Sequence, residues 1–504
     1  MRRDSAVSTV LSRAPLGLAA PLVRVEVHLG PGLPAFAMVG LPEAVVRESR
    51  ERVRSALLTS GLEFPAGRIT VNLSPADLPK EGGRFDLPIA VGILAASGQL
   101  SERTLGQREF YGELALSGEL RETPKLLPAL MAGARTPCEL VLPAANALEA
   151  SWVAGPNVKL ADHLRQVCEA LRGGTVLRAA TPLPQEDRTT MRFDLADVRG
   201  QFGAKRALEI AAAGGHGMLM IGPPGAGKTL LAQRLPGLLP PLDRDEALEV
   251  ASLESAAGRK PTLGGRRPFR SPQHTASAAA LIGGGALRPG ELSLAHLGVL
   301  FLDELPEFAR NALAALREPL ESGVVVLSRA KRACEFPARF QLIAAMNPCP
   351  CGYAGDRRGR CRCTVEQIAR YRSRISGPLI DRIDMHVELT AVPVEHLLSD
   401  AAPPPENSSL IAARVARARH AQMRRQGKLN SRLTPSEVAG ICRLERESRA
   451  LIGTAVTRLG LSARAYHRVL KLARTCADLA GESQIRAIDV SEAVNLRALD
   501  RLAR

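Results

Sequence analysis

The sequence predicts an α/β nucleotide-binding core that follows an α+β domain and precedes a helical domain. The first observation is the glycine-rich motif GPPGAGKT at residues 222–229, which follows the apolar run MLMI. The second is the acidic pair Asp303-Glu304, which ends the apolar run VLFL. The third is a C-terminal segment with helical patterns and no strand-like run. Between residues 190 and 395, helices alternate with short apolar strands, which is typical of a parallel sheet.

The chain has 504 residues, too many for a single core, so two or three domains are expected. Changes in composition and hydrophobic pattern along the sequence predict five parts. These are a domain at 1–172, a linker at 173–192, the α/β core at 193–395, a linker at 396–408 and a helical lid at 409–504.

Each part has its own expected elements. In the first, LVRVEVHL, RITVNL and EFYGELALSGEL are expected strands, and residues 42–61 and 86–100 are expected helices. In the last, helices are expected at 408–426, 434–460, 462–481 and 487–504. Thr434 opens the second of these as a helix cap.

No run of about 18 apolar residues is free of charge or of proline and glycine, so no membrane span is expected. The first twenty residues lack a continuous apolar stretch, which predicts a cytoplasmic location. The net charge of +16 indicates a polyanionic partner such as DNA. Most basic residues are arginine, so a GC-rich genome is the other explanation, although the excess is concentrated in residues 411–504.

The motif at 222–229 satisfies G-x-x-x-x-G-K-S/T in the strand–loop–helix setting that a phosphate loop requires. Backbone N–H groups would surround the phosphates, Lys228 would reach the β- and γ-phosphates, and Thr229 would bind Mg²⁺. The alternative is a structural glycine-rich turn. The predicted nucleotide-binding set is Gly222, Pro223, Pro224, Gly225, Ala226, Gly227, Lys228, Thr229 and Leu230.

Acidic and amide side chains follow two further apolar runs. Asp303 is predicted to hold Mg²⁺ and Glu304 to polarise the attacking water. Asn347, after LIAAM, is placed to orient that water, although an asparagine at a strand end is more often a turn former. Arg382 and Arg464 are the candidates that neutralise charge on the leaving phosphate. Taken singly, each arginine would form a surface ion pair.

Gly323, the run VVVL and the sequence SRAKR predict a hairpin with a basic tip at Arg329, Lys331 and Arg332. Such a tip would contact DNA phosphates independently of the base sequence. The alternative is a solvated turn. The glycine-rich segment LIGGGALRPGEL is expected to be a second mobile insert in which Gly283, Gly284 and Gly285 adopt unusual dihedral angles.

Four cysteines crowd into one short segment, CPCGYAGDRRGRCRC. Cys349, Cys351, Cys361 and Cys363 could provide the four thiolates of a structural Zn²⁺ site. Free or redox-active thiols are the alternative. The four arginines between and beside these cysteines could also meet DNA.

The core and lid resemble the AAA+ ATPases of the magnesium-chelatase/MCM branch, and the whole chain resembles the YifB/ComM family of magnesium-chelatase-like proteins. The similarity runs from about residue 7 to 500 and rests on strings such as FAMVGLPEAVVRESRERVRSAL, VNLSPADLPKEGGRFDLPIA and SGPLIDRIDMHVEL. It implies a homo-hexameric ring that hydrolyses ATP with Mg²⁺ at subunit interfaces. Arg382 would then act in trans as an arginine finger, Arg464 as a sensor, and the basic hairpin would project into the channel. The family resemblance also implies helicase and branch-migration activity on DNA, with recombination proteins as partners, during natural transformation.

The first domain resembles a Lon-protease-like (S5-type α+β) domain that lacks its catalytic serine. In PKEGGRFD, Arg84 stands where that resemblance places the serine, and Leu127 stands near the lysine position, two residues after Lys125. A guanidinium cannot act as a nucleophile. Ser74 is another hydroxyl, but nothing in the sequence supports it as a nucleophile. We therefore expect a non-proteolytic scaffold, and an ATP-dependent protease is the disfavoured alternative. A chelatase-like remodeler of a protein or of a metal-insertion partner is the other alternative.

Overall fold

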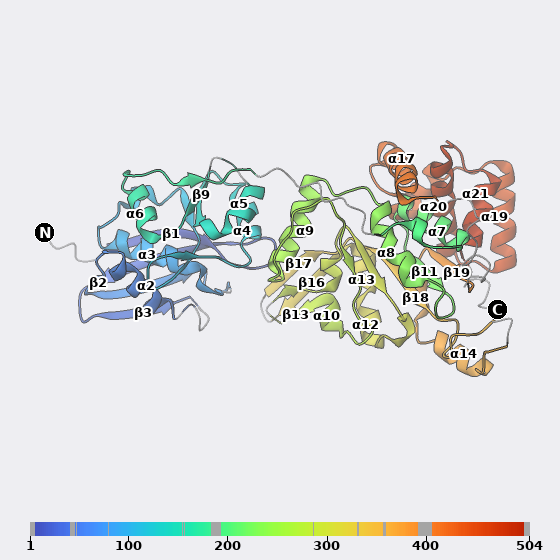
Figure 1. Cartoon of the computed structure of the whole chain (residues 1–504), viewed down its shortest axis with the longest axis horizontal. Coiled ribbons are helices and arrows are strands. Elements are labelled where there is room, and N and C mark those ends of the chain that lie inside the picture. The colour runs from blue at the N-terminus through green and yellow to red at the C-terminus, as the bar shows by residue number, and fades with distance from the viewer. Residues whose placement is uncertain are drawn as a thin grey trace.

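The structure is a computed structural model that describes residues 6–497 except 41–45, 47, 79, 154, 156, 183–192, 286, 330–331, 356–358 and 392–405. The N-terminal domain, the α/β core and the C-terminal helices follow one another along the longest axis of the molecule (Figure 1). Among the described residues, no helix is both long and apolar enough to cross a bilayer.

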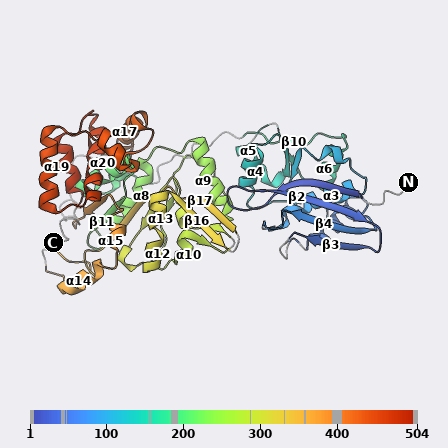
Figure 2. The same ribbon diagram turned by 180° about the vertical axis from the view of Figure 1, so that it is seen from behind.

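An eight-stranded sheet forms the N-terminal domain, and Figure 2 shows its strands from behind. Along β2, buried residues alternate with more exposed ones near its start, as expected for a sheet with one face on the core. Helix α3 (Asp86–Ala96) is buried along almost its whole length against this sheet. In spatial order the strands are β10 (Arg178–Ala179), β9 (Val158–Ala161), β8 (Glu139–Pro143), β5 (Arg108–Phe110), β1 (Ala6–Arg13), β2 (Leu22–Gly30), β4 (Arg68–Ser74) and β3 (Ala35–Val39).

The helices of this domain are α2 (Ser49–Thr59), α3 (Asp86–Ala96), α4 (Leu127–Gly133), α5 (Ala147–Trp152) and α6 (Leu164–Leu171). The single strand expected at residues 109–120 is wrong. It is broken into β5, β6 (Glu113–Leu114) and β7 (Leu120–Arg121), because the chain turns back at Gly118, whose φ of 93° suits glycine alone. Helix α2 begins at Ser49, and most of the earlier residues of the helix expected at 42–61 lie outside the described residues.

The α/β core contains a five-stranded sheet in the order β12-β15-β18-β11-β19, and all its pairings are parallel. This confirms the predicted α/β class. Along β11, Met218 and Met220 enter one apolar cluster while Leu219 and Ile221 enter another, so both faces of the strand are covered. The strands are β12 (Phe269–Arg270), β15 (Val299–Leu302), β18 (Gln341–Met346), β11 (Met218–Ile221) and β19 (Met385–Glu388).

Helices and two hairpins surround this sheet. The helices α7, α8 and the C-terminal helices contribute to the cluster on one face, and α10, α12 and the longer hairpin to the cluster on the other. The helices are α7 (Phe202–Gly214), α8 (Lys228–Leu238), α9 (Arg244–Ala256), α10 (Ala278–Ile282), α11 (Glu291–Leu294), α12 (Arg310–Ala315), α13 (Arg317–Ser322), α14 (Val365–Arg372) and α15 (Gly377–Ile380). The hairpins are β13 (Gly283–Gly284) with β14 (Arg288–Pro289) and β16 (Val324–Arg329) with β17 (Arg332–Pro337).

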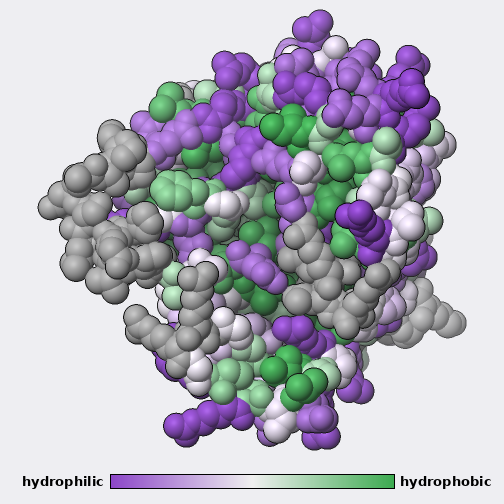
Figure 3. Space-filling view, turned by 90° about the vertical axis from the view of Figure 1, so that its right-hand side faces the viewer, coloured by the Kyte–Doolittle hydropathy of each residue, from purple (hydrophilic) through white to green (hydrophobic). Residues whose placement is uncertain are grey.

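The C-terminal domain is helical, with α17 (Ser408–Gln426), α18 (Pro435–Ile441), α19 (Arg446–Leu459), α20 (Ala463–Ala480) and α21 (Ala487–Asn495). The expected single helix at 434–460 is wrong, because Leu444 leaves the helical path to form a β-bridge with Ile485. Thr434 does cap α18, in a reciprocal pair with Glu437. Helix α21 ends at Asn495, short of the expected residue 504. Figure 3 shows this end of the molecule, where hydrophilic residues dominate the upper edge and hydrophobic ones gather toward the centre.

The N-terminal domain packs on α9 of the core through α4 and α5. Leu127 and Trp152 share an apolar cluster with Leu248 and Ala251 of α9. Arg244, at the start of α9, donates a hydrogen bond of 3.0 Å to the carbonyl of Trp152. The two domains are therefore joined by a packed surface as well as by the chain.

Candidate nucleotide and metal sites

The phosphate-loop motif forms the turn between β11 and α8. Gly225 and Gly227 have φ angles of 76° and 87°, which only glycine adopts without strain. A Cβ atom on Gly222 would lie 2.7 Å from the carbonyl oxygen of Leu389, so this position also requires glycine. Such a glycine-rich loop at the N-terminus of a helix offers backbone N–H groups to an anion.

Lys228 and Thr229, the first residues of α8, reach the neighbouring strand ends. The ammonium of Lys228 donates to the carbonyls of Gly222 (2.6 Å) and Pro223 (3.1 Å) and to Oδ1 of Asn347 (3.0 Å). Burial lowers the pKa of Lys228, and the charges of Asp303 and Glu304 oppose that shift. Pro224, Ala226 and Leu230 complete the predicted set along the loop and α8; Ala226 is buried and Leu230 is exposed.

The acidic pair lies at the same sheet edge. Oγ1 of Thr229 donates to Oδ2 of Asp303 at 3.0 Å. Glu304 has a φ of 52° and a half-exposed side chain, and its carboxylate pairs with Nδ1 of His274 at 3.3 Å. The sequence reasoning did not single out His274. Its only signal is its position shortly after the short strand β12, which neighbours β15 in the sheet.

The two predicted arginines lie apart from this group. Arg382 follows α15, forms an ion pair of 2.6 Å with Glu321 and donates to the carbonyl of Pro378. Arg464 is exposed in the first turn of α20. Within the described residues, neither arginine has an ion pair or hydrogen bond to the phosphate loop.

A buried junction between core and lid was not predicted. Asp384 accepts hydrogen bonds from Nδ1 of His216 (3.1 Å) and from Arg468. Burial alone would raise the pKa of Asp384, but the His216 hydrogen bond and the Arg468 charge hold it well below its usual range. Arg468 lies one turn after Arg464 on α20, and that spacing was the one available signal.

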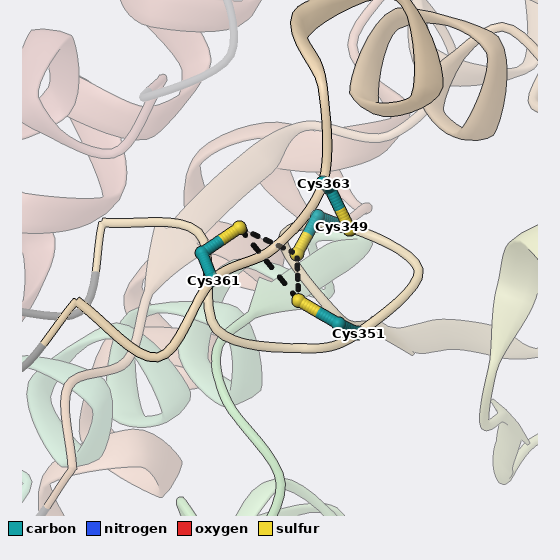
Figure 4. Close-up of side chains that lie close together, drawn as sticks. All are labelled: Cys349, Cys351, Cys361 and Cys363. Carbon is teal, nitrogen blue, oxygen red and sulfur yellow. Dashed lines mark hydrogen bonds between the residues drawn. The ribbon is translucent and has the colours of Figure 1, made fainter.

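The four cysteines come together (Figure 4). The Sγ atom of Cys349 lies 3.3 Å from that of Cys351 and 3.8 Å from that of Cys361, and the last two are 3.6 Å apart. With Cys363, all four sulfurs lie within 4.8 Å of one another. The backbone N–H of Ala354 donates to Sγ of Cys349, which is fully buried.

The basic hairpin is formed by β16 and β17, with Arg329 opposite Arg332 at its end. Lys331 lies outside the described residues, as do the side chains of Arg329 and Arg332 and two of the four loop arginines. In the second insert, Gly283 and Gly285 have positive φ angles as expected, whereas Gly284, which pairs with Arg288, does not.

Arg84 is buried in the N-terminal domain. Its Nη2 donates to the carbonyls of Pro124 (2.6 Å) and Lys125 (3.1 Å), and burial lowers its pKa to about 10. The nearby Lys125 has its ammonium 2.8 Å from Glu81. Asp86 pairs with Arg52 instead of Arg84. The guanidinium therefore binds the loop that leads into α4, at the surface that packs on α9.

Three family models match the chain: "Magnesium chelatase, subunit ChlI" at residues 194–397, "Subunit ChlI of Mg-chelatase" at 25–146, and "Magnesium chelatase, subunit ChlI C-terminal" at 405–497. Competence protein ComM of Haemophilus influenzae is 49% identical over 504 residues, covering 98% of each chain. The protein YifB of Escherichia coli is 49% identical over 500 residues, also covering 98% of each. DNA helicase MCM8 of Bos taurus is 26% identical over 186 residues, covering 36% of this chain and 19% of the helicase.

Replacing Arg84 by serine is expected to lower stability without creating a protease. The two part-buried hydrogen bonds from the guanidinium to the carbonyls of Pro124 and Lys125 are lost, which costs about 1–3 kcal/mol of unfolding free energy, and Lys125 remains paired with Glu81. Urea unfolding and casein hydrolysis measure the two effects. Arg50→Ser, at a position whose side chain is about half exposed, is the control and should change neither. Casein cleavage by Arg84→Ser would refute the assignment of this domain.

Proposed function

Because the chain belongs to the YifB/ComM family of magnesium-chelatase-like proteins, we propose that it is a hexameric, ATP-hydrolysing motor that moves on DNA. Its activity would be unwinding and branch migration that aid recombination of imported DNA, in the cytoplasm and with recombination proteins as partners. The observation that carries the proposal is the meeting of Lys228, Thr229, Asp303 and Asn347 at one edge of the parallel sheet.

The site fits a nucleoside triphosphate with Mg²⁺. The loop glycines leave room for phosphate oxygens near the first N–H groups of α8, and Lys228 can exchange its carbonyl acceptors for those oxygens. The oxygens of Thr229 and Asp303, already 3.0 Å apart, are suited to hold Mg²⁺, which neutralises phosphate charge. Glu304 and Asn347 would orient the attacking water.

The two arginines would complete the site across a subunit boundary. Arg382 is held by Glu321 and the carbonyl of Pro378 in its own subunit, and no hydrogen bond or ion pair among the described residues joins it to the phosphate loop. We assign it the finger role on a neighbour's nucleotide, and Arg464 of the lid the sensor role. A ring supplies such neighbours by repeating one head-to-tail interface.

DNA contact is assigned to the tip of the β16–β17 hairpin, with Arg329, Lys331 and Arg332. The antiparallel pairing that carries this tip supports the assignment. So does the charge of +16, because phosphate contact is sequence-independent and electrostatic. The similarity to a DNA helicase over 36% of the chain points the same way.

A chelatase-like remodeler is the second candidate, and the descriptions of the three matching family models favour it. Both candidates share the ATP site, so the polymer or partner that stimulates hydrolysis distinguishes them. Stimulation by forked or four-way DNA supports the motor. Stimulation by a porphyrin but not by DNA would replace the motor with the remodeler.

We also propose that Cys349, Cys351, Cys361 and Cys363 bind a structural Zn²⁺. With Zn–S bonds of about 2.3 Å, a tetrahedral site places its sulfurs about 3.8 Å apart. The Sγ separations of 3.3, 3.6 and 3.8 Å are close to this expected sulfur–sulfur distance. They are much longer than the bond of about 2.05 Å in a disulfide, which favours a metal over the redox alternative.

Two substitutions test the ATP site. Lys228→Ala should abolish ATP turnover, because the main cation for the β- and γ-phosphates is lost. Glu304→Gln should lower turnover by at least about a hundredfold while ATP stays bound, because the water is no longer activated. Lys260→Ala, at an exposed lysine, should hydrolyse ATP like the wild type. Normal phosphate release from both site variants would overturn the assignment.

The double variant Arg329→Ala/Arg332→Ala tests the hairpin. DNA-stimulated ATPase and unwinding of forked DNA should fall, while hydrolysis without DNA is retained. The slope of log affinity against log salt should decrease by about 1.4–1.8, from two lost phosphate contacts. Arg103→Ala, at an exposed arginine of the N-terminal domain, is the matched control. An unchanged salt slope in the double variant would remove the hairpin from the DNA interface.

Metal analysis of the purified protein tests the cysteine site. We expect about one zinc per chain in the wild type and little in Cys361→Ser, which removes one of four ligands. Cys138→Ser, at a partly exposed cysteine outside the cluster, should keep its zinc. Absence of bound metal from the wild type would end the proposal.

A further inference from the structure

The cysteine cluster begins where the nucleotide site ends. Asn347, which binds Lys228, directly follows β18, and Cys349 is only two residues further along the chain. The N–H of Gly222 donates to the carbonyl of Met346 at 3.2 Å, so the same strand end also supports the start of the phosphate loop. Any rearrangement at Cys349 therefore acts on Asn347 over a very short stretch of chain.

A direct contact joins the cluster to the phosphate loop. Gly352, between Cys351 and the rest of the cysteine loop, is buried and has a φ of 83°. A Cβ atom there would lie 2.7 Å from Cδ of Pro224 and 3.8 Å from Cγ of Asn347. The turn thus rests against the ring of Pro224, with its N–H bonded to the carbonyl of Cys349 at 3.0 Å.

The segment that follows the cluster contacts residues near the acidic pair Asp303-Glu304. Helix α14 starts almost directly after Cys363, and Nε of its Arg372 donates to the carbonyl of Pro348 at 3.4 Å. Just beyond the helix, Arg374 forms an ion pair of 2.7 Å with Glu307, three residues after Glu304. The cluster and the segment that follows it therefore contact three strand ends or loops of the proposed ATP site.

We propose that metal binding at the four cysteines and nucleotide binding at the phosphate loop are energetically linked. The metal-bound turn holds Gly352 against Pro224 and fixes Asn347 where it meets Lys228, so the zinc-loaded protein binds ATP more tightly than the zinc-depleted protein. The inference rests on the proposed ATPase function and adds a dependence of that site on the metal.

Linkage between two binding sites is reciprocal, which gives a readout that does not depend on turnover. If zinc raises ATP affinity by a given factor, bound ATP must raise zinc affinity by the same factor. We expect this factor to be about tenfold, within the usual range for linked sites. The zinc-loaded, full-length protein carrying Glu304→Gln is suited to the measurement, because it should hold ATP without consuming it.

The experiment measures zinc affinity by competition with a chromogenic chelator, with and without saturating ATP and Mg²⁺, and measures ATP affinity before and after zinc removal. Both affinities should change by the same factor. Lys228→Ala should keep its zinc but lose the effect of ATP on it. Pro224→Ala should also keep its zinc and show a smaller effect, since the proline ring that Gly352 touches is gone; circular dichroism confirms that each variant is folded.

The outcomes separate the two proposals. A zinc-loaded wild type that binds no ATP contradicts the proposed function itself. A zinc-loaded protein that binds ATP, but whose zinc and ATP affinities are independent of each other, overturns only the linkage. Failure of the wild type to bind zinc overturns the linkage as well, while leaving the ATP site untouched.

Discussion

Parallel pairing of β15, β18 and β11 is the constraint on which the candidate site depends. Leu302 pairs with Ala344 on β18, and Ala344 pairs with Leu219 on β11, so the three strands end at nearly the same level. The phosphate loop, Asn347 and the acidic pair follow these ends directly. Backbone hydrogen bonds, each individually modest, thereby fix the relative positions of side chains that are far apart in sequence.

Hydrogen bonds of the polar side chains orient the groups that follow these strand ends. The ammonium of Lys228 has three oxygen acceptors within 3.1 Å, and the hydroxyl of Thr229 has one. Such hydrogen bonds hold the cation and the prospective magnesium ligand close to the positions in which they would work. Preorganised charge of this kind stabilises developing phosphate charge without reorganisation during the reaction.

Much of this site was predictable from sequence because its determinants are local. Gly222 to Thr229 form one turn, and an apolar run followed by Asp303 or Asn347 reports a strand and its end. Parallel pairing then brings the ends together without further information. Helices such as α17 and α20 were predictable for the same reason, since their caps and apolar spacing lie within the segment.

The parts that sequence reasoning missed depend on burial and on distant partners. Asp384 meets His216 and Arg468 only after the lid has packed on the core. His274 meets Glu304 because β12 joins the sheet beside β15, and β12 has only two residues. The break between α18 and α19 at Leu444 likewise depends on a β-bridge to Ile485, which no local sequence pattern predicts.

The same distinction explains Arg84. The sequence shows that no serine stands at this position. Only the structure shows that the guanidinium donates hydrogen bonds to the carbonyls of Pro124 and Lys125. A buried cation needs acceptors, and these two hold the loop that leads into α4 in place. Because Leu127 of α4 packs on α9 of the ATPase core, the Arg84 region supports a contact between domains. Arg84 thus contributes to the contact between the N-terminal domain and the proposed motor.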